Sequence, residues 1–291
     1  MTMKHAAQSA IYALCCLAIT SAAVRAADVA LTDRATMQEA LRAIPWERLG
    51  PEGKETVQQV TENTTVFRRM PTKTFICDPE MHVYLLRHPD VVVNIWELMG
   101  ISKVRVDRMG DNSFRAVDGG GTTCDVEILF GAPEVHVIYA EGTYTGPLFK
   151  NQLHGKCVLM IRSSYQRTDD GQIQVTNTLD AFLQLENLGL ELVAKTFQPM
   201  MGKAADFNFT ECCTFVGRVS QAAEINPQSI QRMSGRLGHV KPAIRQEFAE
   251  VGARVGERAA ARVAERDAAV RAASAQARLP GVPNEYALPR R

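Results

Sequence analysis

The sequence carries almost no excess charge and, after residue 26, no long hydrophobic run. Its 33 lysine and arginine residues nearly balance 32 aspartate and glutamate residues, so the formal net charge is only +1. Because proteins that bind nucleic acid through phosphate contacts usually carry a basic surplus, the composition argues against a general nucleic-acid binder. No segment after residue 26 reaches the roughly 20 apolar residues of a transmembrane helix. We therefore expect the mature chain to be soluble.

The sequence also lacks the Cys-x-x-Cys spacing that is typical of zinc sites. Cys212 and Cys213 are adjacent, and neighbouring residues on a helix point about 100° apart. Five cysteines follow residue 26, and an odd number leaves at least one unpaired in an exported protein. Cys77, Cys124 and Cys157 lie in strand-like runs, where a buried cysteine usually acts as a small hydrophobe. We expect no metal and no cofactor, whereas the sequence leaves open whether a disulfide forms.

No catalytic signature is present. His136 and His154 would serve as an acid or a base, but neither has a serine, cysteine or carboxylate partner at a spacing known from catalytic triads. The glycines Gly119–Gly121 lie between two strand-like runs. Phosphate-binding glycine loops open helices, so this segment predicts a hairpin turn. We expect a binding protein rather than an enzyme, and a cyclase-like or hydrolase-like enzyme stays an alternative.

Residues 1–26 have the features of a secretory signal peptide. A weakly basic start at Lys4 and His5 precedes a short apolar run, Ile11–Val24, and Ala26 provides a small residue at the cleavage position. The run has roughly 13 apolar residues, too few to span a bilayer. We expect an exported protein, periplasmic or extracellular, and a retained N-terminal anchor is the alternative.

Residues 27–69 read as a helical N-terminal extension. Thr36–Ile44 carries Met37 and Leu41 at helical spacing, Pro45 interrupts it, and a weaker helical pattern follows over Gly53–Val66.

The main domain is expected over residues 70–225. A strand, Lys73–Cys77, precedes two helical segments, and six strand-like runs then fill 103–185. Asp78 and Pro79 form a good helix start, as N-cap and first helical residue. Almost all connections between the strands are short, which predicts an antiparallel meander. A long helical stretch from Asn187 to Ala223 follows, with a break near Pro199. A charged helical extension over 226–279 and a disordered tail over 280–291 complete the chain.

This order of elements resembles the helix-grip fold of the START-like superfamily. That superfamily includes lipid-transfer START domains, polyketide cyclase-like proteins and plant allergens. Stretches such as Asp78-Pro79-Glu80, His88-Pro89 and Asn94-Ile95-Trp96 are similar to START-like sequences. The resemblance covers about Met70 to Ala223. It implies an α+β fold in which a curved antiparallel sheet wraps a long helix and encloses a cavity for a hydrophobic small molecule or lipid.

Alternation along one strand separates two sets of side chains. Lys156, Val158, Met160, Arg162 and Ser164 share one side, and Cys157, Leu159, Ile161, Ser163 and Tyr165 share the other. The second set is more apolar, so we expect it to face the long helix. The candidate ligand-binding residues are Glu141, Met160, Ile161, Arg162, Tyr165, Phe182, Leu192, Phe197 and Met200.

Glu141 and Arg162 are the polar pair among these candidates. A carboxylate and a guanidinium on neighbouring strands would bind a polar head group in an otherwise apolar cavity. The alternative is a cross-strand ion pair on the wet face of the sheet.

The charged extension carries two stripes. The basic stripe consists of Arg254, Arg258, Arg262 and Arg266. The apolar stripe consists of Ile244, Phe248, Val251 and Val255. Together they predict peripheral membrane contact or pairing with a partner helix, unless the helix is solvated and its arginines are neutralised by glutamate. The leading functional expectation is a carrier of a hydrophobic ligand, and a non-catalytic protein that recruits partners through this helix is an alternative. The sequence does not indicate an oligomeric state.

Overall fold

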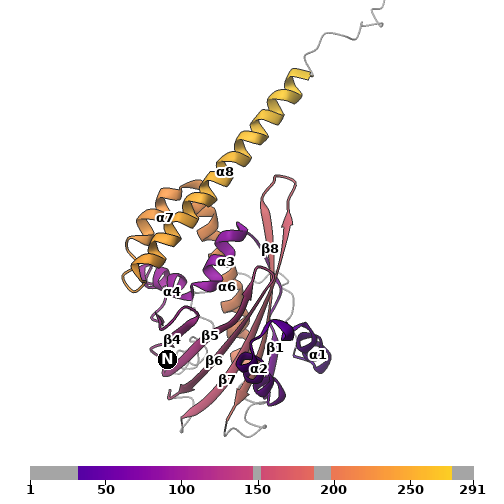
Figure 1. Ribbon diagram of the computed structural model, residues 1–291, viewed down its shortest axis with the longest axis vertical. Coiled ribbons are helices and arrows are strands. Elements are labelled where there is room, and N and C mark those ends of the chain that lie inside the picture. The colour runs from indigo at the N-terminus through magenta and orange to yellow at the C-terminus, as the bar shows by residue number, and fades with distance from the viewer. Residues whose placement is uncertain (1–31, 147–151, 187–197, 277–291) are drawn as a thin grey trace, which may run out of the picture.

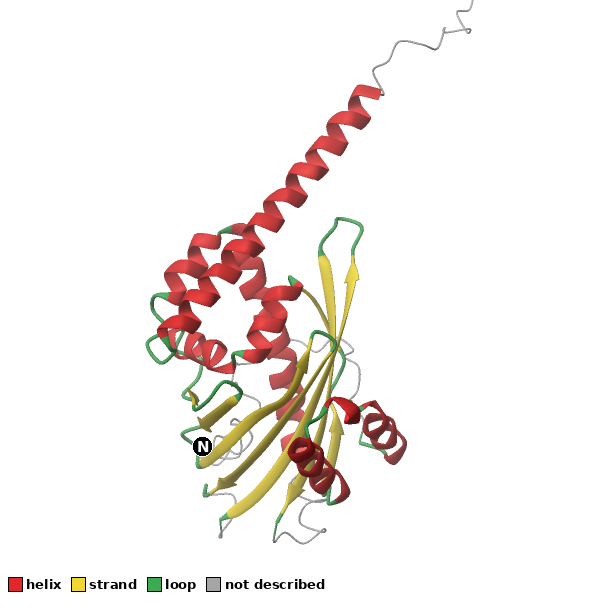
Figure 2. Ribbon diagram, in the orientation of Figure 1, coloured by secondary structure: helices red, strands yellow, loops and turns green. Residues whose placement is uncertain are grey.

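The computed structural model describes residues 32–146, 152–186 and 198–276. These residues form a curved antiparallel sheet, helices on both of its faces, and a group of helices at one end (Figures 1 and 2). The predicted signal peptide, 1–26, and the predicted tail, 280–291, lie outside the described residues.

The sheet has eight strands in the described part of the chain. Six of them form a meander of consecutive antiparallel pairs: β3 (Arg105–Arg108), β4 (Ser113–Val117), β5 (Thr122–Ala132), β6 (Val135–Tyr144), β7 (Leu153–Arg167) and β8 (Ile173–Leu185). Two short strands, β1 (Val66–Arg69) and β2 (Lys73–Ile76), both pair with β8. The predicted α+β class and antiparallel meander are therefore confirmed.

The segment before the sheet contains two helices, α1 (Arg34–Ala43) and α2 (Pro51–Glu62), with a short 3-10 turn, η2 (Trp46–Arg48), between them. The prediction that the segment is helical as far as residue 69 was wrong. Val66–Arg69 is a strand because it can pair with β8, where Phe67 lies opposite Phe182 and is buried.

Helix boundaries follow the capping residues. The Asp78 carboxylate accepts hydrogen bonds from the backbone N–H groups of Glu80, at 2.9 Å, and Met81, at 3.3 Å, and so starts α3 (Pro79–Arg87). Helix α4 (Pro89–Leu98) ends near Gly100, whose φ of 68° is the left-handed conformation that glycine adopts most easily. Gly119 and Gly121 also have positive φ, in the turn between β4 and β5, which confirms the predicted hairpin.

The two faces of the sheet are covered by different helices. Helices α1 and α2 cover one face, which we call the α1–α2 face. Helix α6 (Gln198–Ile225) lies over the other, which we call the α6 face (Figure 1). On the α6 face, Cys157, Leu159 and Ile161 belong to a cluster with Phe209 and Cys213 of α6. The prediction that this set of β7 side chains faces the long helix is confirmed.

At the end of the molecule beyond the sheet, the helices enclose a separate hydrophobic cluster. Residues of α3, α4 and α6 pack there with α7 (Pro227–Ser234) and with the first part of α8 (Pro242–Gln276). Phe248, Val251 and Val255, from the predicted apolar stripe, are each at most 2 % exposed. This stripe therefore contributes to the core of the chain's own fold.

Beyond Arg262, α8 projects away from the body, and its side chains from Val263 to Ser274 are exposed (Figure 1). Its exposed apolar side chains there include Val263 and Val270. Among the described helices, none combines the length and the hydrophobicity needed to cross a membrane.

Candidate ligand site on the α6 face of the sheet

Small residues occupy neighbouring positions on the α6 face. Cys124 of β5 lies opposite Gly142 of β6, which lies opposite Gly155 of β7. A Cβ atom at Gly142 would lie 2.5 Å from the Cβ atom of Cys124, so the close approach of these strands requires glycine. Further along the same face, Ile138 and Ile161 are only partly buried although they lie on central strands. This apolar part of the face is therefore not completely covered by other side chains.

A cluster of polar side chains, all buried except the half-buried Tyr165, continues the face beyond Ile161. We call it the histidine cluster, and it consists of His82 from α3, His136 from β6, Ser163 and Tyr165 from β7, and Asn177 from β8. The strand register brings its members together, because Ser163 lies directly opposite Asn177. Both histidines are 0 % exposed, Asn177 is 3 % exposed and Ser163 is 7 % exposed. Buried polar groups of this kind need hydrogen-bond partners to offset their desolvation.

His82 is held by two members of the cluster. Its Nδ1 atom lies 2.8 Å from the Tyr165 hydroxyl, and its Nε2 atom lies 3.0 Å from the amide nitrogen of Asn177. Since the amide nitrogen donates, Nε2 accepts and Nδ1 carries the proton. The Tyr165 hydroxyl in turn donates to the carbonyl of Pro133, at 2.9 Å. Burial lowers the pKa of His82 to about 4, so the ring is neutral at pH 7.

His136 differs from His82 because neither of its ring nitrogens has a hydrogen-bond partner among the described residues. The ring lies beside Gly131: a Cβ atom built there would be 3.0 Å from its Cδ2 atom. Burial, with the nearby positive charge of Arg87, lowers the pKa of His136 to about 4. The Ser163 hydroxyl and the Oδ1 atom of Asn177 likewise make no hydrogen bond of standard geometry within the described structure. The cluster thus offers free hydrogen-bonding capacity in a buried place.

The histidines of the cluster are neutral at pH 7, so each has one donor and one acceptor for hydrogen bonds. No carboxylate hydrogen-bonds to His82 or His136 in the described part of the chain, and its described residues contain no group of three or more potential metal ligands. Two buried thiols near the face are also poor nucleophiles. Burial raises the pKa of Cys124 to about 12 and raises that of Cys77 further, so both stay protonated at neutral pH.

The structure divides the predicted site residues between the two faces. Ile161 and Tyr165 lie on the α6 face, and Tyr165 belongs to the histidine cluster. Met160 and Phe182 lie on the α1–α2 face, where both are 0 % exposed and pack with residues of α1 and α2. Adjacent residues of a strand point to opposite faces, so Met160 and Phe182 cannot line a site between the sheet and α6.

The predicted pair of Glu141 and Arg162 does not form. Glu141 lies opposite Lys156 in the strand register, with 3.7 Å between charged atoms, and accepts a hydrogen bond from the Tyr139 hydroxyl. Arg162 lies six residues further along β7 and instead contacts Asp180, at 3.1 Å. Both side chains are on the α1–α2 face, so neither belongs to the histidine cluster.

Leu192 and Phe197 lie outside the described residues, as does the side chain of Met200. Sequence reasoning missed His82 and Asn177 as site residues. His82 lies between the apolar residues Met81 and Val83, and Asn177 lies between the buried residues Val175 and Leu179, which are two positions away on the same side of β8. That pattern was the available signal, but only the fold shows that the two residues meet.

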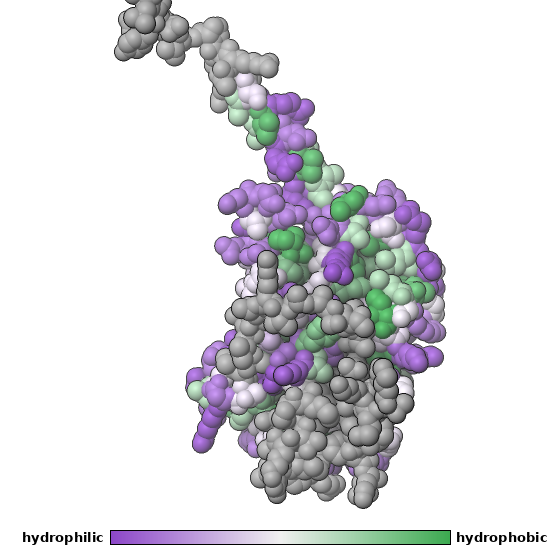
Figure 3. Space-filling model, turned by 180° about the vertical axis from the view of Figure 1, so that it is seen from behind, coloured by the Kyte–Doolittle hydropathy of each residue, from purple (hydrophilic) through white to green (hydrophobic). Residues whose placement is uncertain are grey.

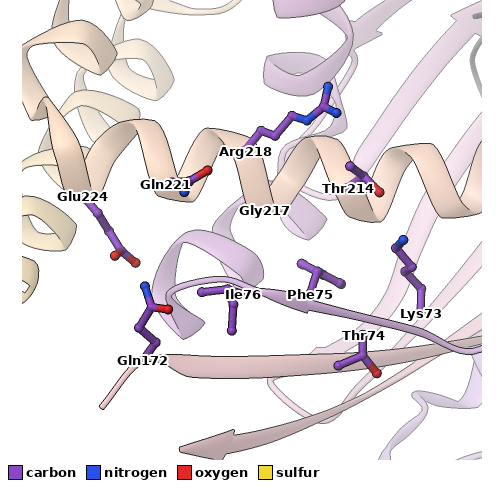
Figure 4. Close-up of a pocket in the computed structure, with 10 residues that line it drawn as sticks. All are labelled: Lys73, Thr74, Phe75, Ile76, Gln172, Thr214, Gly217, Arg218, Gln221 and Glu224. Atoms are coloured by element: carbon purple, nitrogen blue, oxygen red, sulfur yellow. The ribbon is translucent and has the colours of Figure 1, made fainter. Parts of the chain in front are cut away.

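A separate groove runs between β2 and α6 (Figure 4). It has a volume of about 330 Å³ and contains none of the predicted ligand-binding residues. A Cβ atom at Gly217 would lie 3.0 Å from the carbonyl oxygen of Ile76, so this glycine allows α6 to pack closely on β2. The groove is lined mainly by polar side chains, with Lys73 and Glu224 at different ends (Figure 4).

The basic stripe of α8 mostly contacts the chain's own carboxylates. Arg254 pairs with Glu80 at 2.6 Å, and Arg258 pairs with both Asp78 and Glu80 at 2.8 Å. Arg262 pairs with Glu224 at 2.7 Å, and Arg266 is exposed. Three of the four guanidinium groups therefore attach α8 to α3 and α6, and binding of a membrane or partner helix by this stripe stays a prediction. Seen from behind, hydrophobic side chains gather over the helical end, and the projecting helix carries hydrophilic and hydrophobic side chains in turn (Figure 3).

Comparison with known proteins does not assign the chain to a family. No protein-family model matches the chain, and no curated protein matches it. Solved structures similar to part of the chain include a conserved protein from Geobacillus kaustophilus, with 13 % identity and a TM-score of 0.37 over 50 % of this chain and 90 % of that one. A hypothetical protein from Helicobacter pylori has 13 % identity and a TM-score of 0.32, over 50 % and 86 % of the two chains. A protein from Rhizobium loti has 15 % identity and a TM-score of 0.29, over 49 % and 95 %.

Proposed function

We propose that the protein binds a small, largely apolar molecule on the α6 face of the sheet, in a helix-grip arrangement. The apolar body of the ligand would contact Ile138, Leu159 and Ile161, and its polar end would reach the histidine cluster. Affinity would come mainly from removing apolar surface from water, at roughly 25 cal/mol per Å². With the signal-peptide features of residues 1–26, this binding supports a role as an exported carrier.

The observation that carries the proposal is His136. A fully buried imidazole with two unpartnered nitrogens costs free energy unless something bonds to it. Its neighbour in the strand register, Ile161, is partly exposed although it lies on a central strand. An apolar surface next to a buried polar group with free bonding capacity is the usual composition of a small-molecule site.

A second candidate function is recruitment of a partner through α8. Val263 is 53 % exposed and Val270 is 60 % exposed, and they lie seven residues apart on the projecting part of the helix. This spacing places both on one side of the helix. Deletion of residues 263–291, which leaves the Arg262–Glu224 pair in place, separates the two candidates, because ligand binding on the α6 face should survive it.

The first experiment is a fluorescence titration with N-phenyl-1-naphthylamine, a neutral apolar probe. We expect saturable binding that weakens several-fold in Ile161→Thr, because this change removes apolar surface on the α6 face and adds a hydroxyl. Val135→Thr is the matched control, since Val135 is a partly buried residue of the neighbouring strand on the α1–α2 face. Absence of saturable binding, or equal loss in both variants, would contradict a ligand site on the α6 face.

A further inference from the structure

We propose that the ligand presents a neutral group that both donates and accepts hydrogen bonds, such as a hydroxyl or a primary or secondary amide, to the histidine cluster, and that the site rejects carboxylates, phosphates and sulfates. This inference rests on the proposed ligand binding and defines the chemical class of the molecule bound.

The free atoms of the cluster define what the ligand must offer. Neutral His136 has one N–H donor and one nitrogen acceptor, and both are unpartnered. The Ser163 hydroxyl can donate and accept, and Asn177 Oδ1 can only accept. A group that both donates and accepts, above all a hydroxyl, satisfies this mixture. An anionic oxygen would only accept, and it would leave the acceptor atoms of His136 and Asn177 unsatisfied.

The charges around the cluster point the same way. His82, His136, Ser163, Tyr165 and Asn177 are all neutral at pH 7. Cys213 of α6, whose sulfur lies 3.8 Å from the amide nitrogen of Asn177, cannot supply a positive charge. A buried anion needs a paired cation to offset the loss of its hydration. No such cation lies within the cluster.

Arg87 is the cation whose charge acts on His136, and it lies at the edge of the site. Its side chain is exposed, and one of its nitrogens donates to the carbonyl of Gly131 at 2.7 Å. The exposed carboxylate of Glu134, from the segment just before His136, lies at the same edge and opposes its charge. The solvated guanidinium would therefore attract an anion to the rim without compensating one inside.

The test compares 1-decanol with decanoate as competitors of N-phenyl-1-naphthylamine at pH 8. The two have the same chain length and differ only at the head group. We expect 1-decanol to displace the probe at a concentration at least tenfold lower than decanoate does. His136→Phe and Ser163→Ala should each reduce this ratio at least threefold, because they remove hydrogen-bonding atoms from the cluster. The ratio compares two competitors in the same variant, so it does not depend on how tightly that variant binds the probe. Ser163→Ala is the conservative variant should the phenylalanine not fit.

Equal or tighter binding of decanoate would overturn the inference, and loss of that binding in Arg87→Gln would assign the head group to Arg87. An unchanged ratio in both His136→Phe and Ser163→Ala would also overturn it, since the cluster would then not contact the head group. Failure of the probe and of both competitors to bind would instead refute the underlying ligand binding. The outcomes therefore distinguish failure of the head-group preference from failure of ligand binding itself.

Discussion

Phe182→Ala should lower the free energy of unfolding by about 3–5 kcal/mol, the usual cost of removing a fully buried phenylalanine. The Phe182 ring is 0 % exposed and packs against Phe67, with 5.1 Å between ring centroids, in the cluster beneath α1 and α2. Alanine would leave a cavity between the sheet and these helices. Chemical denaturation monitored by circular dichroism measures the loss.

Two further variants show whether the effect has this cause. Phe207→Ala removes a ring that is 40 % exposed, so its effect on stability should be much smaller. Phe182→Leu keeps most of the buried volume and should bind N-phenyl-1-naphthylamine as tightly as the unaltered protein does, because residue 182 lies on the α1–α2 face. Weaker probe binding by a stable Phe182→Leu protein would show that this side chain lines the ligand site after all.

Asp180→Ala should cost about 3 kcal/mol of stability, near the lower end for breaking a buried ion pair, because its cationic partners are partly solvated. The Asp180 side chain is 0 % exposed and accepts hydrogen bonds from two nitrogens of Arg69, at 2.6 and 3.1 Å, and from Arg162, at 3.1 Å. Its removal leaves both guanidinium groups without this carboxylate on the α1–α2 face. Thermal and urea denaturation would measure the change.

The matched control is Asp125→Ala. Asp125 also makes a two-pronged pair with an arginine, Arg115, at 2.7 and 2.9 Å, but both side chains are more than half exposed. Exposed pairs contribute little because water screens them, so the denaturation midpoint should hardly move. Similar losses in the two variants would contradict a special role for burial at Asp180.

Much of the fold was predictable because local patterns and tertiary structure agree. Alternating residues with glycine-containing turns at Gly119–Gly121 and Gly171 predicted the meander, and the Asp78 cap predicted the start of α3. Val66–Arg69 escaped prediction because its strand state depends on pairing with β8, more than 110 residues away. Local sequence contains no information on such a partner.

The candidate site was less predictable for a similar reason. Alternation correctly assigned Ile161 and Tyr165 to the face that α6 covers. It could not show that the opposite face is also buried, by α1 and α2, so apolar residues such as Met160 and Phe182 were taken as ligand contacts. The meeting of His82 with Asn177 depends on how α3 packs against β8, which no spacing along the chain reveals.

The most direct test of ligand binding is native mass spectrometry of the protein purified gently from its native source. The proposed site predicts a bound molecule that is released on denaturation, is largely apolar, carries a neutral polar group, and is lost or reduced in Ile161→Thr but retained in Val135→Thr. A mass equal to that of the polypeptide alone, with no uptake from a lipid extract, would contradict ligand binding on the α6 face.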